Sequence, residues 1–432
     1  MRQLFNKYIK ENLLLKLTSA NGVGVLIRMF VGFLSSKAIA IFVGPEGFAI
    51  VGYMRNVMNV LQRLPLFGAN NGIIRYVAEH KFDPKELRKV VSTMFFLGMG
   101  GTLIISLVMF FGASFWNRLI FGERDFTYIF TVVAVVLPFF TLNALMVHFF
   151  NGLSRYRKYL LINVVGAVIA ALLTIVLSWQ MGVDGALLAF VIAPAVILIF
   201  TLLLLGEDGH HFKAISRKYF SKEVVSKMGG YSLMAIVSLI SVNVVDILIK
   251  NLLQDALGLD EVGYWEAMKR LSNYYLMFVT SLLTLYVLPK LAKDQSNTNF
   301  RTVVFGFYKT VMPFFAIGLL LVYLTKYYIV VITLSKDFLQ VQELFLWQLI
   351  GDFIKVAALA MSYQFQAKGM VKMFVVTELL SVLIIYLSSI YLIDRFGLEG
   401  VTLAHAVSYL CYFFVMLLIF RKALFFGESP SS

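Results

Sequence analysis

The sequence has few of the residues on which soluble enzymes, disulfide scaffolds and metal centres depend. Only 14% of its 432 residues are charged, whereas a soluble domain has about 25%. The one cysteine, Cys411, lies in an apolar run, which makes an intrachain disulfide impossible and gives no basis for a thiolate metal cluster. The five histidines are scattered, except for His210 and His211 in a polar stretch. We therefore expect neither a metal site nor a cofactor.

Motifs of catalysis are missing as well. The sequence contains no GxxxxGK[ST] phosphate-binding loop, so ATP is not expected to drive the protein directly. It also offers no arrangement of a nucleophile with a general base. Together these absences argue against an enzyme.

Long apolar runs are what the sequence has instead. Hydrophobic residues make up 60% of the chain, and a membrane-crossing helix needs about 20 residues, most of them apolar. The runs predict an all-α polytopic membrane protein with 12 transmembrane helices. The predicted spans are residues 17–43, 47–77, 89–114, 127–150, 158–179, 184–206, 228–253, 262–290, 301–324, 342–366, 370–393 and 398–420.

Positive charge is distributed unevenly between the two sides of the predicted membrane. The formal net charge is +14, with 38 lysines and arginines. Because basic residues concentrate in cytoplasmic connections, their distribution predicts that both termini are cytoplasmic and that residues 1–16 form a retained N-terminal helix. The net positive charge then reflects the orientation of the chain in the membrane and requires no nucleic acid partner. The few basic residues in connections on the other side are Arg118, Arg124, Lys326, Lys336 and Arg395.

Short glycine turns recur at a fixed interval. Gly47 and Gly263 are 216 residues apart, and Gly185 and Gly400 are 215 residues apart. The repeat predicts two six-helix bundles of the same orientation, related by a pseudo-two-fold axis along the membrane normal. A cleft between such bundles can open alternately to each side, although a duplicated bundle can also be a rigid scaffold. The predicted bundles are residues 1–210 and 211–432.

The second predicted span carries a polar stripe. On a helix of 3.6 residues per turn its polar residues fall on one side, while the other faces stay apolar. A charge inside the bilayer is costly, so the arginines must face protein, water or an anion. Since spans one to six have no acidic residue at mid-membrane depth, the partners come either from the second half or from an anionic ligand. The stripe consists of Arg55, Asn59, Gln62, Arg63 and Asn70, and Pro65 is expected to kink it.

Span one adds two basic residues. Arg28 lies between Gly24 and Gly32, and small residues let a neighbouring helix approach that face. We therefore expect Arg28 to point at protein or at a cleft. Lys37 faces the opposite way, and either snorkelling to the membrane interface or a role in the cleft would account for it.

The second half differs because its spans combine acids with bases on one face. Two interpretations stay open: the carboxylates form structural ion pairs, or Asp246 or Asp352 takes up a proton or cation during transport. Glu378 and His405 are weaker candidates for the second role. The polar sets are Asn243, Asp246 and Lys250 in span seven, Glu266, Lys269 and Arg270 in span eight, and Gln348, Asp352 and Lys355 in span ten.

Four stretches of the sequence resemble the Wzx-type polysaccharide flippases. The most specific has the pattern Trp-Gln-Leu-x-Gly-Asp-x-x-Lys and runs from Trp347 to Lys355. The resemblance extends from about Ser19 to Arg421 and is greatest to members that handle the lipid-linked unit of enterobacterial common antigen. The stretches are residues 42–47, 260–265, 286–291 and 346–355.

The resemblance implies both a fold and a function. The family belongs to the multidrug/oligosaccharidyl-lipid/polysaccharide exporter superfamily, so we expect a multidrug-efflux-like fold in a bacterial inner membrane. Its members move undecaprenyl-pyrophosphate-linked oligosaccharides from the cytoplasmic to the periplasmic leaflet, with the glycan polymerase and chain-length regulator as candidate partners. The related lipid II flippases usually have fourteen spans, which the twelve predicted here do not match.

The implied substrate assigns roles to the polar residues. For the pyrophosphate we expect Arg28, Arg55, Arg63, Arg270, Lys37 and Lys250. For the sugars we expect Asn59, Gln62, Asn273 and Tyr274, and for ion coupling Asp352, Asp246 and Lys355, with Asp352 preferred. The alternative is a drug or cation antiporter of the same fold, which would need acids where the first half offers only bases. A scaffold for the polymerase complex would need no charged cleft.

Overall fold

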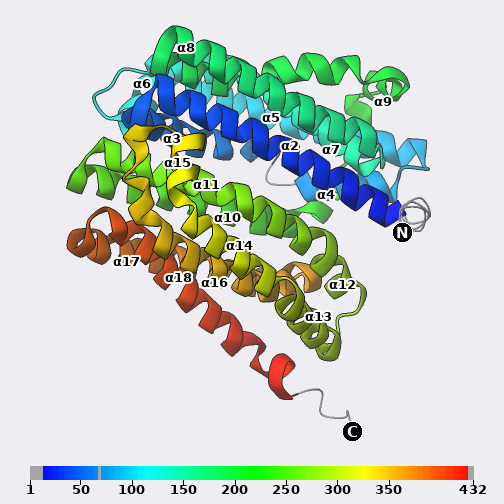
Figure 1. Ribbon diagram of the computed structural model, residues 1–432. Coiled ribbons are helices and arrows are strands. Elements are labelled where there is room, and N and C mark those ends of the chain that lie inside the picture. Colours follow the sequence, from blue (N-terminus) through cyan, green and yellow to red (C-terminus); the bar gives the residue numbers. More distant parts are fainter. Residues whose placement is uncertain (1–12, 67–69, 427–432) are drawn as a thin grey trace, which may run out of the picture.

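The computed structural model describes residues 13–66 and 70–426, and this part of the chain is all helical (Figure 1). Its side chains are described for residues 24–66, 72–226 and 234–425. The predicted N-terminal helix therefore falls largely outside the described residues, as does the side chain of Asn70.

The helices follow one another with short connections. The first half contains α2 (Leu13–Phe42), α3 (Gly44–Leu61), α4 (Asn70–Glu79), α5 (Pro84–Phe111), α6 (Ala113–Phe121), α7 (Thr127–Gly152) and α8 (Tyr156–Leu203). The short helix α9 (Gly209–Lys213) lies in the connection between the halves. The second half contains α10 (Lys222–Leu257), α11 (Leu259–Leu282), a π-helical turn (Leu283–Val287), α12 (Leu288–Lys293), α13 (Asn297–Thr310), α14 (Met312–Leu324), α15 (Lys326–Thr333), α16 (Val341–Lys368), α17 (Val371–Phe396), α18 (Leu398–Arg421) and a last π-helical turn (Lys422–Phe426).

Ten helical segments of the described chain are long and apolar enough to cross a membrane. One of them, α8, bends at Gly182, whose φ of 57° lies in the left-handed region that favours glycine. The bend divides α8 into the fifth and sixth predicted spans. With α3 and α4 as the second span, each of the twelve predicted ranges falls on helical structure. The short helices α6, α9 and α15 were not predicted.

The second predicted span is not one continuous helix, which corrects the prediction of a single stripe. Helix α3 ends at Leu61, a 3₁₀ turn spans Leu64–Leu66, and α4 begins at Asn70. Pro65 explains the break, because proline has no backbone N–H to donate and its ring clashes with the preceding turn of a helix. Gln62 and Arg63 therefore lie just beyond the end of α3 rather than within a helix.

The turns at Gly44, Gly182, Gly258 and Gly397 lie together at one end of the molecule, on the left in Figure 1, which we call the turn end. A Cβ atom built on Gly263 would lie 2.0 Å from the carbonyl oxygen of Pro45, and one on Gly397 would lie 3.8 Å from Leu257. The opposite end, which we call the loop end, carries the connections before α5, before α8 and between α8 and α10. Helices α9 and α12 lie there.

Side chains tie down the connections at the loop end. Asp83 accepts hydrogen bonds from the backbone N–H groups of Lys85 and Glu86 and so caps α5, which begins with Pro84. Asp208 lies 2.6 Å from the Nζ of Lys158 and 3.2 Å from Arg155. Burial acts to raise the pKa of the Asp208 carboxyl, but the hydrogen bond and charge of Lys158, with the charge of Arg155, outweigh it and leave that pKa below its usual value.

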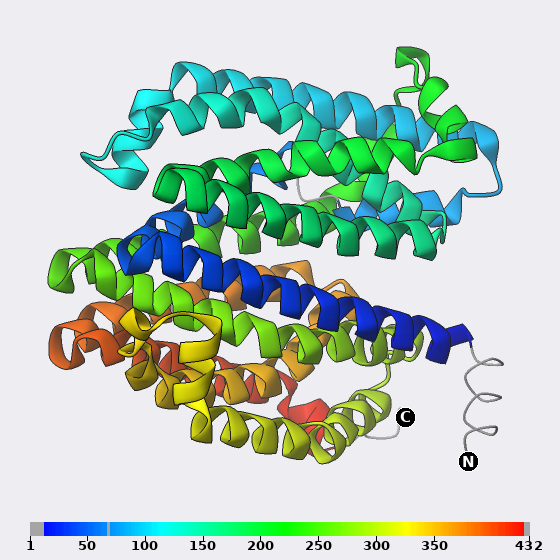
Figure 2. The same ribbon diagram turned by 45° about the horizontal axis from the view of Figure 1, so that its top comes forward.

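The two halves meet where α3 crosses α11. In the first half α8 packs against α2 and α7, and α7 packs against α5, whereas in the second half α18 packs against α16 and α17, and α17 packs against α10 (Figure 2). Helix α3 makes its most extensive contact with α11, although it belongs to the first half of the chain. The division into bundles 1–210 and 211–432 stays a prediction.

The crossing of α3 and α11 predicts the effect of a small substitution. Gly263→Ala should lower the free energy of unfolding by about 1 to 3 kcal/mol, because the Pro45 carbonyl that the new methyl group would meet belongs to the backbone and cannot turn aside. The midpoint of thermal unfolding of the purified protein in detergent measures the loss. Gly318→Ala is the matched control, because a Cβ atom there meets nothing within 4 Å. Equal midpoints for both variants would contradict the close crossing.

Candidate functional site

A cavity of about 1270 Å³ lies between the halves, in the part of the molecule nearer the loop end. We call it the large cavity. Helices α7, α8, α10, α16 and α17 contribute to its wall, together with the π-helical turn before α12. Its lining combines Arg63 and His148 with amide side chains and includes no acidic residue of the described chain. The amides are Gln62, Asn143, Asn163, Asn243 and Gln366.

Only part of this lining was predicted. Gln62 and Arg63 came from the polar stripe, whereas Asn143, His148 and Asn163 were missed. The sequence does carry a signal for them, since they are polar residues within two largely apolar spans. Such residues are less conspicuous than a charged one, because placing an uncharged amide in a membrane helix costs much less free energy than placing an ion there.

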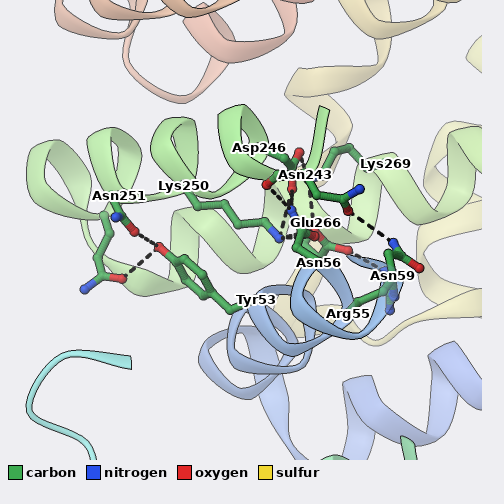
Figure 3. Close-up of polar contacts among 11 residues, drawn as sticks. Tyr53, Arg55, Asn56, Asn59, Asn243, Asp246, Lys250, Asn251, Glu266 and Lys269 are labelled. Carbon is green, nitrogen blue, oxygen red and sulfur yellow. Dashed lines mark hydrogen bonds and ion pairs between the residues drawn. The ribbon is translucent and has the colours of Figure 1, made fainter. Parts of the chain in front are cut away.

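An ion cluster joins the halves at the turn end (Figure 3). It consists of Arg55 on α3, Asp246 and Lys250 on α10, and Glu266 and Lys269 on α11, and we call it the inter-half cluster.

Glu266, which is 3% exposed, is the centre of this cluster. Its carboxylate pairs with the guanidinium of Arg55 across the halves and lies 3.0 Å from the Nζ atoms of both Lys250 and Lys269. Asp246 lies 3.1 Å from Lys250 and 2.5 Å from Lys269. The inter-half cluster thus contains two carboxylates and three cationic groups, and its formal net charge is +1.

Local sequence explains how these groups reach one another. Asp246 and Lys250 are four residues apart and Glu266 and Lys269 three apart, which are the spacings of neighbours on one helix face. Gly52 lets Glu266 lie against α3, because a Cβ atom there would be 2.5 Å from the Glu266 Cγ. Asn56 bridges the halves by donating to Asp246 at 2.6 Å and accepting from Lys250 at 3.2 Å.

For Arg55 the cluster shows which of the two partners left open by the sequence is present in this structure. Arg55 has an internal acid from the second half as its partner, and Lys250 is fully buried between two carboxylates. For Asp246, Lys250 and Glu266 the structure therefore shows the structural ion pairs that the sequence left as one of two alternatives. Asn59 also faces the second half, with its amide donating to Asn243 at 3.4 Å.

Three other predicted arginines form no ion pair within the described part of the chain. Arg63 is exposed on the wall of the large cavity. The Nε of Arg28 and the Nη1 of Arg270 are both buried without a hydrogen-bond partner. Arg270 also donates from its Nε to the hydroxyl of Tyr274 at 3.2 Å. These arginines keep N–H groups available for a further acceptor.

Lys37 and Tyr274 are held elsewhere. Lys37 donates to the carbonyl oxygens of Val331 and Ile332 at the end of α15, where the negative pole of the helix favours a cation. This contact is neither of the two roles considered for Lys37. Tyr274 is buried against α2, because its hydroxyl lies 2.7 Å from that of Ser36 and its ring fills the space above Gly32. Neither residue lines the large cavity.

Asp352 lies in a separate polar network inside the second half. Its carboxylate is fully buried and accepts hydrogen bonds from Ser272, from Tyr275 at 2.6 Å, and from Gln348 at 3.2 Å. The Nε2 of His405 on α18 lies 3.0 Å from its other oxygen. Lys355, expected beside Asp352, instead places its Nζ over the ring of Tyr409, 5.1 Å from the ring centre.

A second cavity of about 470 Å³, which we call the small cavity, adjoins this network. Gln348 and His405 line it, and so does Asn273, one of the residues predicted to contact sugar. Within the described residues, no group of three or more His, Cys, Asp or Glu side chains is placed so that it could hold a metal ion.

Comparison with known proteins assigns the chain to a family. The family described as "Polysaccharide biosynthesis protein" matches residues 14–295, which is more than half of the chain. The chain belongs to this family. Among its relatives, a protein from Escherichia coli (strain K12) named "Lipid III flippase" is 27% identical over 388 residues, covering 90% of this chain and 93% of the relative.

Solved structures show the fold of this polysaccharide biosynthesis protein. A transporter of the multidrug resistance MATE family of the MOP superfamily, in an inward-facing conformation, matches with a TM-score of 0.78, 15% identity, and coverage of 93% of this chain and 98% of that one. An outward-facing MATE structure matches with a TM-score of 0.69, 17% identity and coverage of 95% of both chains. The predicted multidrug-efflux-like fold of a multi-pass membrane protein is confirmed.

The inter-half cluster predicts unequal effects for its members. Glu266→Gln should destabilise the protein by about 3 to 5 kcal/mol, because it leaves three cations to share Asp246 alone, and a buried charge without its partner is costly. Arg55→Gln should cost less, since Glu266 keeps two ammonium partners. Thermal unfolding of both purified variants measures the difference. A larger loss for Arg55→Gln would show that Glu266 is not the centre of the cluster.

Proposed function

We propose that this protein moves an undecaprenyl-pyrophosphate-linked oligosaccharide from the cytoplasmic to the periplasmic leaflet of a bacterial inner membrane by alternating access. Membership of the polysaccharide biosynthesis family supports the substrate class. The relative named as a lipid III flippase supports the transport step, and at 27% identity it suggests, as the finer proposal, the lipid-linked unit of enterobacterial common antigen. The glycan polymerase and the chain-length regulator are the partners we would test first.

The composition of the large cavity is the observation that carries this proposal. Arg63 and the amides of its wall suit a diphosphate and sugar hydroxyls, because guanidinium groups bind phosphate oxygens through charge-assisted hydrogen bonds and amides both donate and accept. Arg28 and Arg270, whose free N–H groups would also suit a phosphate, do not line this cavity. The prenyl chain would stay in the surrounding lipid.

The structure corresponds to one state of the proposed cycle. Residues 36–59 of the first half make the direct hydrogen bonds and ion pairs between the described helices α2–α8 and α10–α18. The halves are therefore closed at the turn end, and the large cavity lies toward the loop end. The higher TM-score against an inward-facing transporter agrees with this arrangement. Given the basic residues of its connections, we assign the loop end to the cytoplasm.

Opening of the turn end would change what the cluster offers. Once α3 leaves α11, Arg55 loses the carboxylate of Glu266 and Lys250 loses the amide oxygen of Asn56, and a diphosphate could take the place of both partners. This is the role we propose for these two predicted residues, while Lys37 would hold α15 in place.

An antiporter of organic cations on the same fold is the alternative. Cations would bind to acidic residues, and the large cavity has an arginine and no acid on its described wall. The charge of the wall therefore favours an anionic substrate.

Removal of the cavity arginine tests the proposed function. Arg63→Gln should lower translocation by about tenfold to a hundredfold, because a hydrogen bond to a charged group contributes about 1.5 to 3 kcal/mol. Translocation of fluorescently labelled undecaprenyl-pyrophosphate oligosaccharide in vesicles measures the effect. Arg301→Gln, an exposed arginine at the start of α13, is the matched control and should leave the rate unchanged. Normal transport by Arg63→Gln would refute a diphosphate site on this wall.

We also propose that Asp352, together with His405, couples transport to a proton gradient. Asp352 is buried, yet His405 links it to the small cavity. Three other titratable groups face this network: Tyr275 donates to Asp352, the ring of Tyr409 packs against that of His405, and the Nζ of Lys355 lies over the ring of Tyr409. Asp246 is less suited, because two lysines of the inter-half cluster and the amide of Asn56 already hold it.

The coupling proposal predicts a response to the gradient. Collapsing the proton gradient across reconstituted vesicles should slow the wild-type protein by about tenfold, corresponding to 1.4 kcal/mol, and Asp352→Asn should abolish the response. Translocation rates with and without a proton ionophore provide the measurement. Wild-type transport that ignores the collapse of both the proton and the sodium gradient would exclude this role for Asp352.

A further inference from the structure

The small cavity differs from the large cavity in the balance of its charges. It lies among helices of the second half and shares Ser238, Tyr363 and Gln366 with the wall of the large cavity, so the two spaces adjoin. Two acids and two lysines face it, which gives a formal charge of zero before His405 is counted. They are Asp246, Glu378, Lys269 and Lys355.

Several polar groups of this wall have no charged partner in the described structure. Lys355 contacts the ring of Tyr409, and Glu378 accepts a hydrogen bond from Ser238 at 2.8 Å, but neither forms an ion pair. Gln348 is only 2% exposed, and its Oε1 is buried without a hydrogen-bond partner. The cavity therefore presents an unused acceptor, an unpaired cation and an unpaired anion.

The network around Asp352 fixes the orientation of this unused acceptor. The amide nitrogen of Gln348 donates to Asp352, which directs the amide oxygen away from the carboxylate. Asp352 itself accepts hydrogen bonds from three hydroxyl or amide groups and contacts His405, so its own acceptor capacity is used. The free acceptor on this side of the cavity is therefore Gln348 and not Asp352.

We propose that the small cavity binds the saccharide portion of the transported lipid, an inference that rests on the proposed function. A wall of zero formal charge does not favour a diphosphate, whereas hydroxyl and acetamido groups require donors and acceptors side by side. The half-buried side chain of Tyr409 adds apolar surface against which a sugar ring can lie, while Tyr412 and Trp265 are buried in the same wall. The diphosphate then stays with Arg63, and the sugars extend past Tyr363 into the second half.

The proposal predicts a dependence on the length of the glycan. Two lipids serve as probes: the lipid-linked oligosaccharide that accumulates in cells lacking the gene, and undecaprenyl diphosphate carrying a single N-acetylglucosamine. In vesicles that contain the full-length protein, Lys355→Met and Glu378→Gln should each lower the ratio of oligosaccharide to monosaccharide translocation by at least tenfold relative to wild type. Lys309→Met, at an exposed position of α13, is the matched control and should keep the wild-type ratio.

Direct binding provides a second measurement that does not depend on the variants folding. The free oligosaccharide, released from its lipid and diphosphate, should change the fluorescence of Trp265 in the purified wild-type protein, and Trp265→Phe identifies that signal. Trp265 lines the small cavity, with the Nζ of Lys269 3.9 Å from its ring centre.

The outcomes separate this inference from the function on which it rests. If the wild-type protein transports both lipids and the two cavity variants keep the wild-type ratio, the saccharide site is overturned and the proposed flippase function stands. An unchanged ratio is also what a role of these residues in coupling alone would give. Failure of the free oligosaccharide to bind would also overturn the saccharide site. Wild-type vesicles that move neither lipid would overturn the proposed function itself.

Discussion

The contact of Glu266 with cations from both halves is the interaction on which this structure depends. A carboxylate removed from water is tolerated only with close partners, and Glu266 has Arg55 from α3 and two lysines from its own half. The glycines at positions 52 and 263 bring the two helices close enough for this contact. Because Arg55 comes from the opposite half, closure at the turn end gives Glu266 a third cation and gives Arg55 its carboxylate partner.

Under the proposed function, opening at this contact requires a substitute for the partner that Arg55 loses. Separating α3 from α11 leaves Glu266 with its lysines, but it leaves Arg55 without an acid at a depth where a free guanidinium is costly. The diphosphate is the natural substitute, since its negative charge would replace that of the Glu266 carboxylate beside Arg55. The positive excess of the cluster then favours opening with an anion bound over opening without one.

The fold could be predicted from the sequence because membrane helices must be long and apolar, and the twelve runs record that requirement directly. The interruption of span two was expected only as a kink, since Pro65 signals a break but not its extent. The site was harder to predict. Arg63 and Gln62 were found because polar residues in an apolar run are conspicuous, whereas the partner of Arg55 lies 211 residues further along the chain, and no local pattern specifies that distance. Lys37 was equally out of reach, because backbone carbonyls at the end of α15, a helix that was not predicted, hold it.

The duplication of the chain adds a reason for this particular arrangement. Arg55 and Arg270 are 215 residues apart, the interval of the glycine turns, and they lie on the two helices that cross between the halves. A strictly symmetric pair would place two guanidinium groups near the axis with no acid between them. Glu266 breaks the symmetry, because it occurs on α11 and its counterpart position on α3 is Val51, an apolar residue. The first half thus contributes Arg55 to the inter-half cluster, and the second half supplies the carboxylate that holds this arginine while the turn end is closed.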